Sequence, residues 1–171
     1  AAEFEIYLVA GIHEAVGDKR YNTAVLIGPD GKLVGKYHKQ RLGHEAVRNT
    51  AGNQSPVFKT AFGQVGLMIC KDRGSAELVK RICDNGANFL ICPSGGAFGP
   101  KRNDPVVQAR SQENKTHIVF VHPAEFLVTD PDGKIRQREV LADPLLRGKA
   151  LIIDKEQTGG ELDKKGIFYF N

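Results

Sequence analysis

Two residues in the first half of the sequence have the chemistry of a nucleophile and of an oxyanion-stabilising cation. Cys70 ends an apolar run, and the turn at residues 71–74 then leads into a helical pattern. A strand-to-helix turn projects a side chain, and the amides of a helix N-terminus favour a thiolate and can receive an oxyanion. Lys39 follows another apolar run. An amine held near a thiol can stabilise a tetrahedral oxyanion and move protons. Taken singly, each residue also fits a plainer interpretation, as a packed cysteine and an exposed lysine.

The elements that must position these residues are short strands and two helices. The second helix, predicted at 104–115, begins with Asp104 as its N-cap and Pro105 at its first helical position. The first is predicted at 75–85, where apolar residues recur on one helix face. The predicted strands cover residues 6–12, 22–27, 33–37, 57–61, 64–70, 87–92, 117–122, 125–129, 134–138 and 149–154. The runs at 6–12, 87–92 and 117–122 are typical of buried strands. Strands and helices alternate in the middle of the chain, which indicates an α/β fold with mixed strand directions.

Two hairpins carry nearly the same turn, at residues 28–31 and 130–133. In each turn, proline presets one backbone angle and the final glycine supplies a positive φ. These hairpins add antiparallel pairs to the fold.

Length and composition predict one soluble domain over residues 1–171. The chain is 41% hydrophobic and 26% charged, as in ordinary globular proteins. No apolar run approaches the roughly 18 residues of a membrane span. Three cysteines without a CxxC pair argue against a disulfide framework or a structural zinc site, and predict a reducing cytoplasm. We expect Cys83 and Cys92 to be packing residues, and the histidines show no metal-ligand spacing.

Charge gives little support to nucleic-acid binding. The formal net charge is only +4, and the richest basic stretch, residues 31–48, has no interleaved aromatic platform. Most of these cations are expected on a solvated strand and loop. Nucleic-acid binding is therefore the weakest of the functional hypotheses.

Several motifs follow one another in an order that is hard to explain by chance. They are Tyr21-Asn22-Thr23-Ala24-Val25-Leu26-Ile27, Pro29-Asp30-Gly31, Tyr37-His38-Lys39, Glu45, Gly52, Pro56-Val57-Phe58, Phe62-Gly63, Val65-Gly66-Leu67-Met68-Ile69-Cys70-Lys71-Asp72-Arg73, Glu77, Gly86-Ala87-Asn88-Phe89-Leu90, Pro93-Ser94, Arg110, Glu113 and Asn114. In this order the chain resembles the nitrilase, or carbon–nitrogen hydrolase, superfamily over about residues 5–154.

The resemblance implies an α-β-β-α sandwich with mixed parallel and antiparallel sheets, and a Glu-Lys-Cys triad that needs no metal or cofactor. By position, Cys70 looks like the nucleophile and Lys39 like the oxyanion-stabilising lysine. Glu45 looks like the second glutamate, which helps to hold the lysine and the acyl intermediate. The backbone N–H of Lys71 would complete the oxyanion site. We therefore expect a hydrolase of a small amide, or of a nitrile or carbamoyl compound, that forms a cysteine thioester.

The chain also departs from the family pattern. The general-base glutamate of the family lies upstream of the strand that residues 6–12 match, and it is matched by none of Glu3, Glu5 and Glu14. The sequence thus predicts that the N-terminal portion of the sandwich is missing. A second hypothesis stays open, in which the chain is a catalytically incomplete fragment or pseudoenzyme that serves as a binding or scaffold domain.

Two further departures concern the walls of the site. Lys71 replaces the usual Tyr or Glu after the cysteine, and residues 122–125 stand where a Gly-x-Ser stretch is usual. A missing sandwich layer would also expose apolar strand surface, so we predict a homo-oligomer.

Overall fold

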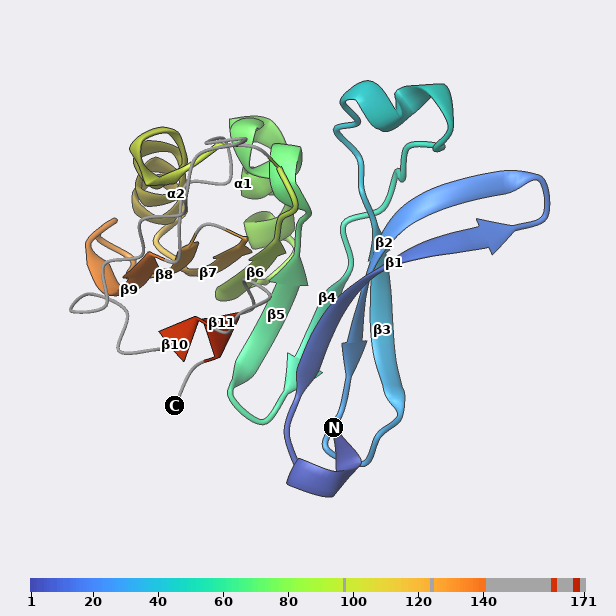
Figure 1. Ribbon diagram of the computed structural model, residues 1–171, viewed down its shortest axis with the longest axis horizontal. Helices are drawn as coiled ribbons and strands as arrows, with labels where there is room; N and C mark the ends of the chain where they lie inside the picture. The colour runs from blue at the N-terminus through green and yellow to red at the C-terminus, as the bar shows by residue number, and fades with distance from the viewer. Residues whose placement is uncertain (97, 124, 141–160, 163–167, 170–171) are drawn as a thin grey trace.

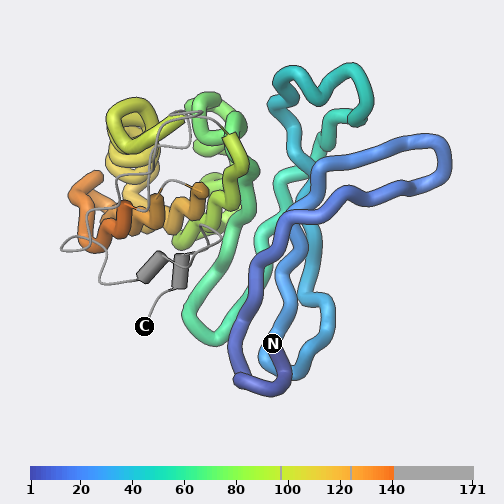
Figure 2. The backbone as a smooth tube through the Cα atoms, viewed as in Figure 1, coloured from blue at the N-terminus to red at the C-terminus, as the bar shows by residue number. Residues whose placement is uncertain are grey.

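The computed structural model describes residues 1–96, 98–123 and 125–140, together with the backbone of two short strands, β10 (Glu161–Leu162) and β11 (Phe168–Tyr169). Its described part forms a helical layer, a six-stranded sheet and a three-stranded sheet (Figures 1 and 2). This is the predicted α/β class, with three of the four layers of the predicted sandwich. The strand predicted at 149–154 lies outside the described residues. None of the described helices is long and apolar enough to cross a membrane.

The three-stranded sheet is antiparallel and consists of β1 (Leu8–Val16), β2 (Lys19–Ile27) and β3 (Leu33–His38). A 3₁₀ turn, η1 (Ala2–Phe4), precedes it. The hairpin predicted between β2 and β3 is confirmed, because Gly31 has φ +76° and its N–H donates to the Gly28 carbonyl at 2.9 Å.

The prediction of a short, buried first strand was wrong. β1 continues to Val16 because it pairs along its whole length with β2. Leu8, Ile12 and Val16 are 40–50% exposed. No described residues form a layer over the outer face of this sheet, so its apolar side chains remain in contact with solvent.

The six-stranded sheet has the order β4-β5-β6-β7-β8-β9. Its strands are β4 (Val57–Thr60), β5 (Gly63–Leu67), β6 (Phe89–Pro93), β7 (His117–His122), β8 (Glu125–Thr129) and β9 (Ile135–Val140). β5, β6 and β7 are parallel, because a helical crossover follows each of the first two, and the outer pairs are antiparallel. The mixed sheet and the second hairpin, with Gly133 at φ +76°, are as predicted.

The two crossovers are α1 (Ala76–Asp84) and α2 (Pro100–Asn114). The Ser75 side chain caps α1 by accepting the Leu78 N–H at 3.4 Å. The predicted start of α2 was wrong: the helix begins at Pro100, Pro105 lies inside it, and Asp104 caps nothing. Instead, Asp104 forms an ion pair with Arg138 of β9. This is a tertiary contact that no local sequence pattern predicts.

Two hydrophobic clusters hold the layers together. One lies between the helices and the large sheet and includes Leu78, Ile82, Leu90, Cys92 and Phe120. The other lies between the two sheets and includes Leu26, Tyr37, Val65, Leu67 and Ile69. Cys92 is fully buried and Cys83 packs against the first cluster, which confirms both as packing residues.

Candidate active site

Cys70 lies on a strained turn between β5 and α1. It opens the 3₁₀ segment η3 (Cys70–Gly74) and has φ +49°, in the left-handed region. For a residue with a Cβ, such a conformation costs on the order of 1–3 kcal/mol and persists only where the surroundings enforce it. The predicted projecting turn is therefore present. Its thiol is only partly buried, in contrast to that of Cys92.

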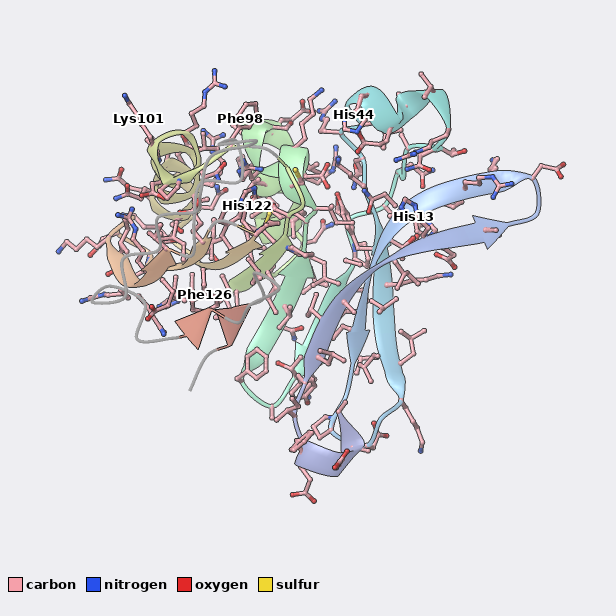
Figure 3. All side chains as sticks on the ribbon, viewed as in Figure 1. His13, His44, Phe98, Lys101, His122 and Phe126 are labelled. Atoms are coloured by element: carbon pink, nitrogen blue, oxygen red, sulfur yellow. The ribbon has the colours of Figure 1, made fainter. Side chains whose placement is uncertain are left out.

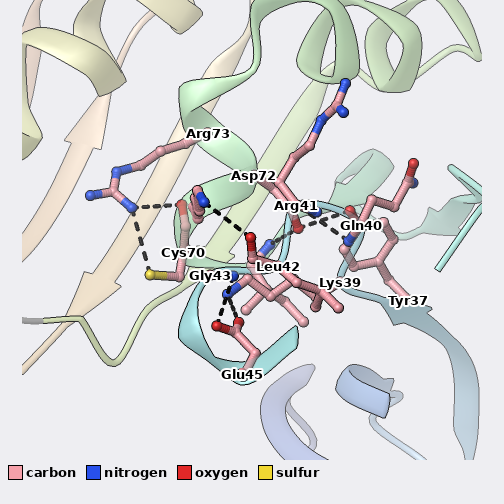
Figure 4. Close-up of polar contacts among 12 residues, drawn as sticks. Tyr37, Lys39, Gln40, Arg41, Leu42, Gly43, Glu45, Cys70, Asp72 and Arg73 are labelled. Atoms are coloured by element: carbon pink, nitrogen blue, oxygen red, sulfur yellow. Dashed lines mark hydrogen bonds and ion pairs between the residues drawn. The ribbon is translucent and has the colours of Figure 1, made fainter. Parts of the chain in front are cut away.

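Lys39 follows β3 and is almost fully buried, with 4% of its surface exposed. Its ammonium forms an ion pair with Glu45, a residue of the 3₁₀ segment η2 (His44–Val47) that is 6% exposed (Figure 4). The Gly43 N–H also donates to Glu45 Oε2 at 2.9 Å. Burial alone would raise the pKa of Glu45, but these donors outweigh it and lower the pKa to about 2. The Glu45 carboxyl is thus held ionised beside Lys39.

Asp72, a buried carboxylate, joins the Lys39 loop to the Cys70 turn. Its Oδ1 accepts the N–H groups of Gln40 and Arg41 at 3.3 and 2.7 Å. Its Oδ2 accepts the Ile69 N–H and the Tyr37 hydroxyl, both at 2.9 Å (Figure 4). These four donors fix the backbone on both sides of the site. Sequence reasoning missed this role, although Asp72 stands two residues after Cys70 in the cysteine motif.

The residues that the sequence singled out share one cavity of about 1010 Å³. Cys70, Lys39, Glu45 and Lys71 all line it. His13 and His44 line it from β1 and η2, whereas Phe98 and His122 line it from the side of the large sheet and α2 (Figure 3). At Gly96 an added Cβ would lie 3.4 Å from Cys70 Sγ, so the segment after β6 passes directly beside the thiol.

The side-chain ammonium and the backbone N–H of Lys71 have different surroundings. Its side-chain ammonium turns to the Leu42 carbonyl, at 3.0 Å. Its backbone N–H makes no hydrogen bond within the described part of the chain. This N–H, next to Cys70, is therefore open to a ligand oxygen.

The structure adds Arg73, Asn103 and Glu125 to the surroundings of Cys70, and the sequence reasoning named none of them as site residues. The Arg73 guanidinium donates to the Cys70 carbonyl at 2.6 Å and to Asn103 Oδ1 at 2.5 Å. No apolar pattern marks Asn103 or Glu125, because the buried positions of α2 and β8 also include the polar residues Asp104, Ser111 and Thr129. Within the described residues, no three His, Cys, Asp or Glu side chains gather as a metal site would require.

The helical layer on two packed sheets is the layering of the nitrilase superfamily. The sequence model of the carbon–nitrogen hydrolase family matches residues 1–140, and the chain belongs to that family.

Its relatives include amidases. The human omega-amidase NIT2 is 33% identical in an alignment of length 139 that covers 72% of this chain and 50% of that protein. The omega-amidase NIT3 of Saccharomyces cerevisiae is 30% identical in an alignment of length 161 that covers 79% of this chain and 55% of that protein. The chain thus spans about half the length of the curated relatives it matches.

Solved structures agree on the fold. The crystal structure of Saccharomyces cerevisiae Nit3 superposes with a TM-score of 0.75 at 31% identity, over 82% of this chain and 58% of that one. An amidase of Nesterenkonia in complex with butyramide gives a TM-score of 0.77 at 22% identity, over 81% and 59% of the two chains.

Proposed function

We propose that Cys70 is the nucleophile of an amidase and that Lys39, Glu45 and the Lys71 N–H assist it. The observation that carries the proposal is the shared cavity, which is lined both by a cysteine on a strained turn and by a buried ion pair. The relatives named omega-amidases support amides as the substrate class, ahead of the nitriles and carbamoyl compounds that the sequence also allows.

In the proposed reaction, Cys70 Sγ attacks the amide carbon and the carbonyl electron pair moves to oxygen. The Lys39 ammonium and the Lys71 N–H stabilise this oxyanion. The Lys39 ammonium gives a proton to the nitrogen and takes the thiol proton in exchange, the C–N bond breaks, and ammonia or an amine leaves. Water then attacks the thioester, which releases a carboxylic acid and restores the thiol. No step calls for a metal or cofactor.

The lining of the cavity favours an amide that also carries an anionic group. Arg48 and Arg102 line it, and neither of them has an ion-pair partner among the described residues. Among the described residues of the lining, the only acidic side chain is that of Glu45, which is already paired with Lys39. A carboxylate on the substrate would supply the missing countercharge.

Ammonia release from monoamides of short dicarboxylic acids tests the proposal, with the uncharged amides of matched length for comparison. Cys70→Ala should abolish turnover, and Cys83→Ala is the matched control because Cys83 lies on α1, outside the cavity lining. Turnover by Cys70→Ala at the parental rate would refute the role of Cys70.

We propose as the alternative a binding or scaffold domain, whose cavity would hold an amide without hydrolysing it. It predicts that the chain binds such amides, measured by calorimetry, without releasing ammonia. Efficient turnover by the 171-residue chain would exclude it.

Homo-oligomerisation and a cytoplasmic location stay predictions. The exposed side chains of Leu8, Ile12 and Leu33 on the small sheet support self-association. Light scattering coupled to gel filtration tests it, and a clean monomer would contradict it.

A further inference from the structure

Arg73 is a buried arginine that reaches around the Cys70 turn. Only 8% of its surface is exposed. One guanidinium nitrogen, Nη1, donates to the Cys70 carbonyl at 2.6 Å and lies 3.9 Å from Cys70 Sγ. The guanidinium also lies over the Phe120 ring, with 4.9 Å between Cζ and the ring centroid. A positive charge is therefore fixed beside the thiol and against an aromatic face.

Asn103, on α2, holds the other end of the guanidinium. Its Oδ1 accepts from Arg73 Nη2 at 2.5 Å. Its Nδ2 donates to the Phe98 carbonyl at 2.6 Å and to Glu125 Oε1 at 2.8 Å. Both Asn103 and Glu125 are fully buried. Because the amide has donors and acceptors on fixed sides, its orientation is determined by these partners.

Glu125, on β8, ends this buried chain of contacts. Burial raises the pKa of its carboxyl, and the Asn103 hydrogen bond and the Arg73 charge act against that rise. Its Oε2 has no hydrogen-bond partner within the described residues. Burying a carboxyl costs free energy. The presence of Glu125 in the core is explained if this side chain fixes the position of another group.

We propose that Arg73 is a positioning residue for Cys70, held in place by Asn103 and Glu125. It anchors the carbonyl of the left-handed Cys70 backbone, so that the thiol points into the cavity, and it places a cation beside Sγ. This inference rests on the proposed role of Cys70 as nucleophile. It concerns the reactivity of the thiol, however, and can be measured without an amide substrate.

Alkylation by iodoacetamide at neutral pH tests the proposal, with the rate at each cysteine followed by peptide mass spectrometry. Arg73→Met should slow alkylation of Cys70 by at least about tenfold, the effect of losing one charge-assisted hydrogen bond. Arg73→Lys keeps the charge and should restore most of this loss. Asn103→Leu removes the hydrogen bond that holds the Arg73 guanidinium, and it should slow alkylation of Cys70 severalfold. The rate at Cys83 should stay constant, as an internal measure of an intact fold.

Arg110→Met is the matched control, because Arg110 is a largely buried arginine of α2 whose ion pair is with Glu113. It should leave the rate at Cys70 unchanged. A rate within twofold of the parent in Arg73→Met would overturn the proposal, and so would an equal loss in Arg110→Met. If Arg73→Met does not fold, as judged by circular dichroism, the alkylation rate of Cys70 in Asn103→Leu is measured instead. A rate within twofold of the parent would then overturn the proposal. A parent that hydrolyses no amide, together with slowed alkylation in these variants, would refute the proposed function and leave the role of Arg73 standing.

Discussion

Replacing Asp72 by Asn tests whether this carboxylate joins the Lys39 loop to the Cys70 turn. The substitution keeps the shape of the side chain but turns one oxygen into an NH₂ group. That group must then face either the Gln40 and Arg41 N–H pair or the Ile69 N–H and Tyr37 hydroxyl.

The second arrangement is the less costly one. Burial, with the Asp72 carboxylate, raises the pKa of Tyr37 well above its usual value, so the phenol stays protonated. Its oxygen can accept a hydrogen bond from the new NH₂ group. The Ile69 N–H alone then loses its acceptor, which costs about 1–3 kcal/mol for a buried donor. We expect Asp72→Asn to lower the free energy of unfolding by about 2 kcal/mol.

Urea denaturation followed by circular dichroism measures this change as a lower midpoint at constant slope. Tyr37→Phe is the control that removes only one of the four donors, and it should cost about 1 kcal/mol. A loss below 0.5 kcal/mol in Asp72→Asn, on the order of an ordinary surface substitution, would refute the reasoning.

Three further predictions follow from individual contacts. Since the pKa of Glu45 is about 2 rather than its usual 4.5, its ion pair contributes on the order of 3 kcal/mol, which is present above pH 4.5 and lost as pH falls towards 2. In acid titrations of stability, Glu45→Gln should remove that part of the pH dependence; parallel parent and variant curves would contradict it. Gly66→Ala should destabilise by about 1–3 kcal/mol in urea, because the new Cβ would lie 2.3 Å from Ile82 Cγ2, whereas Gly74→Ala, with open space around it, should be neutral. Arg102→Ala should raise KM for the anionic amide and leave the uncharged amide unaffected; equal changes would argue against the carboxylate.

Local chemistry was enough to predict the hairpins and the first helix. The turns at 28–31 and 130–133 are fixed by proline and by glycines with positive φ, so neighbours in sequence determine them. The start of α2 and the burial of β1 depend on partners far along the chain. Asp104 caps nothing because Arg138 is its partner, and β1 is exposed because no described layer covers it.

The site shows the same division. Cys70 and Lys39 could be singled out because each follows a strand, and strand ends place side chains at the edge of a layer. Glu45 and Lys71 came only from the resemblance, since η2 has no strong periodic pattern. Asp72, Asn103 and Glu125 act through contacts across 22–35 residues of chain, which no spacing along the sequence reveals.

Asp72 and Arg73 are adjacent, and they attach the Cys70 turn to opposite parts of the fold. Asp72 binds the loop that carries Lys39, whereas Arg73 binds α2 and, through Asn103, β8. Alkylation requires only the thiol, but amide hydrolysis requires the thiol and the oxyanion-stabilising lysine together. Asp72→Asn should therefore reduce amide turnover more than alkylation of Cys70, because it loosens the lysine side. Arg73→Met should reduce amide turnover and alkylation of Cys70 by the same factor, because the substitution acts on the thiol. Equal ratios of turnover to alkylation in the two variants would mean that the turn moves as one piece, and that neither residue serves a separate side of the site.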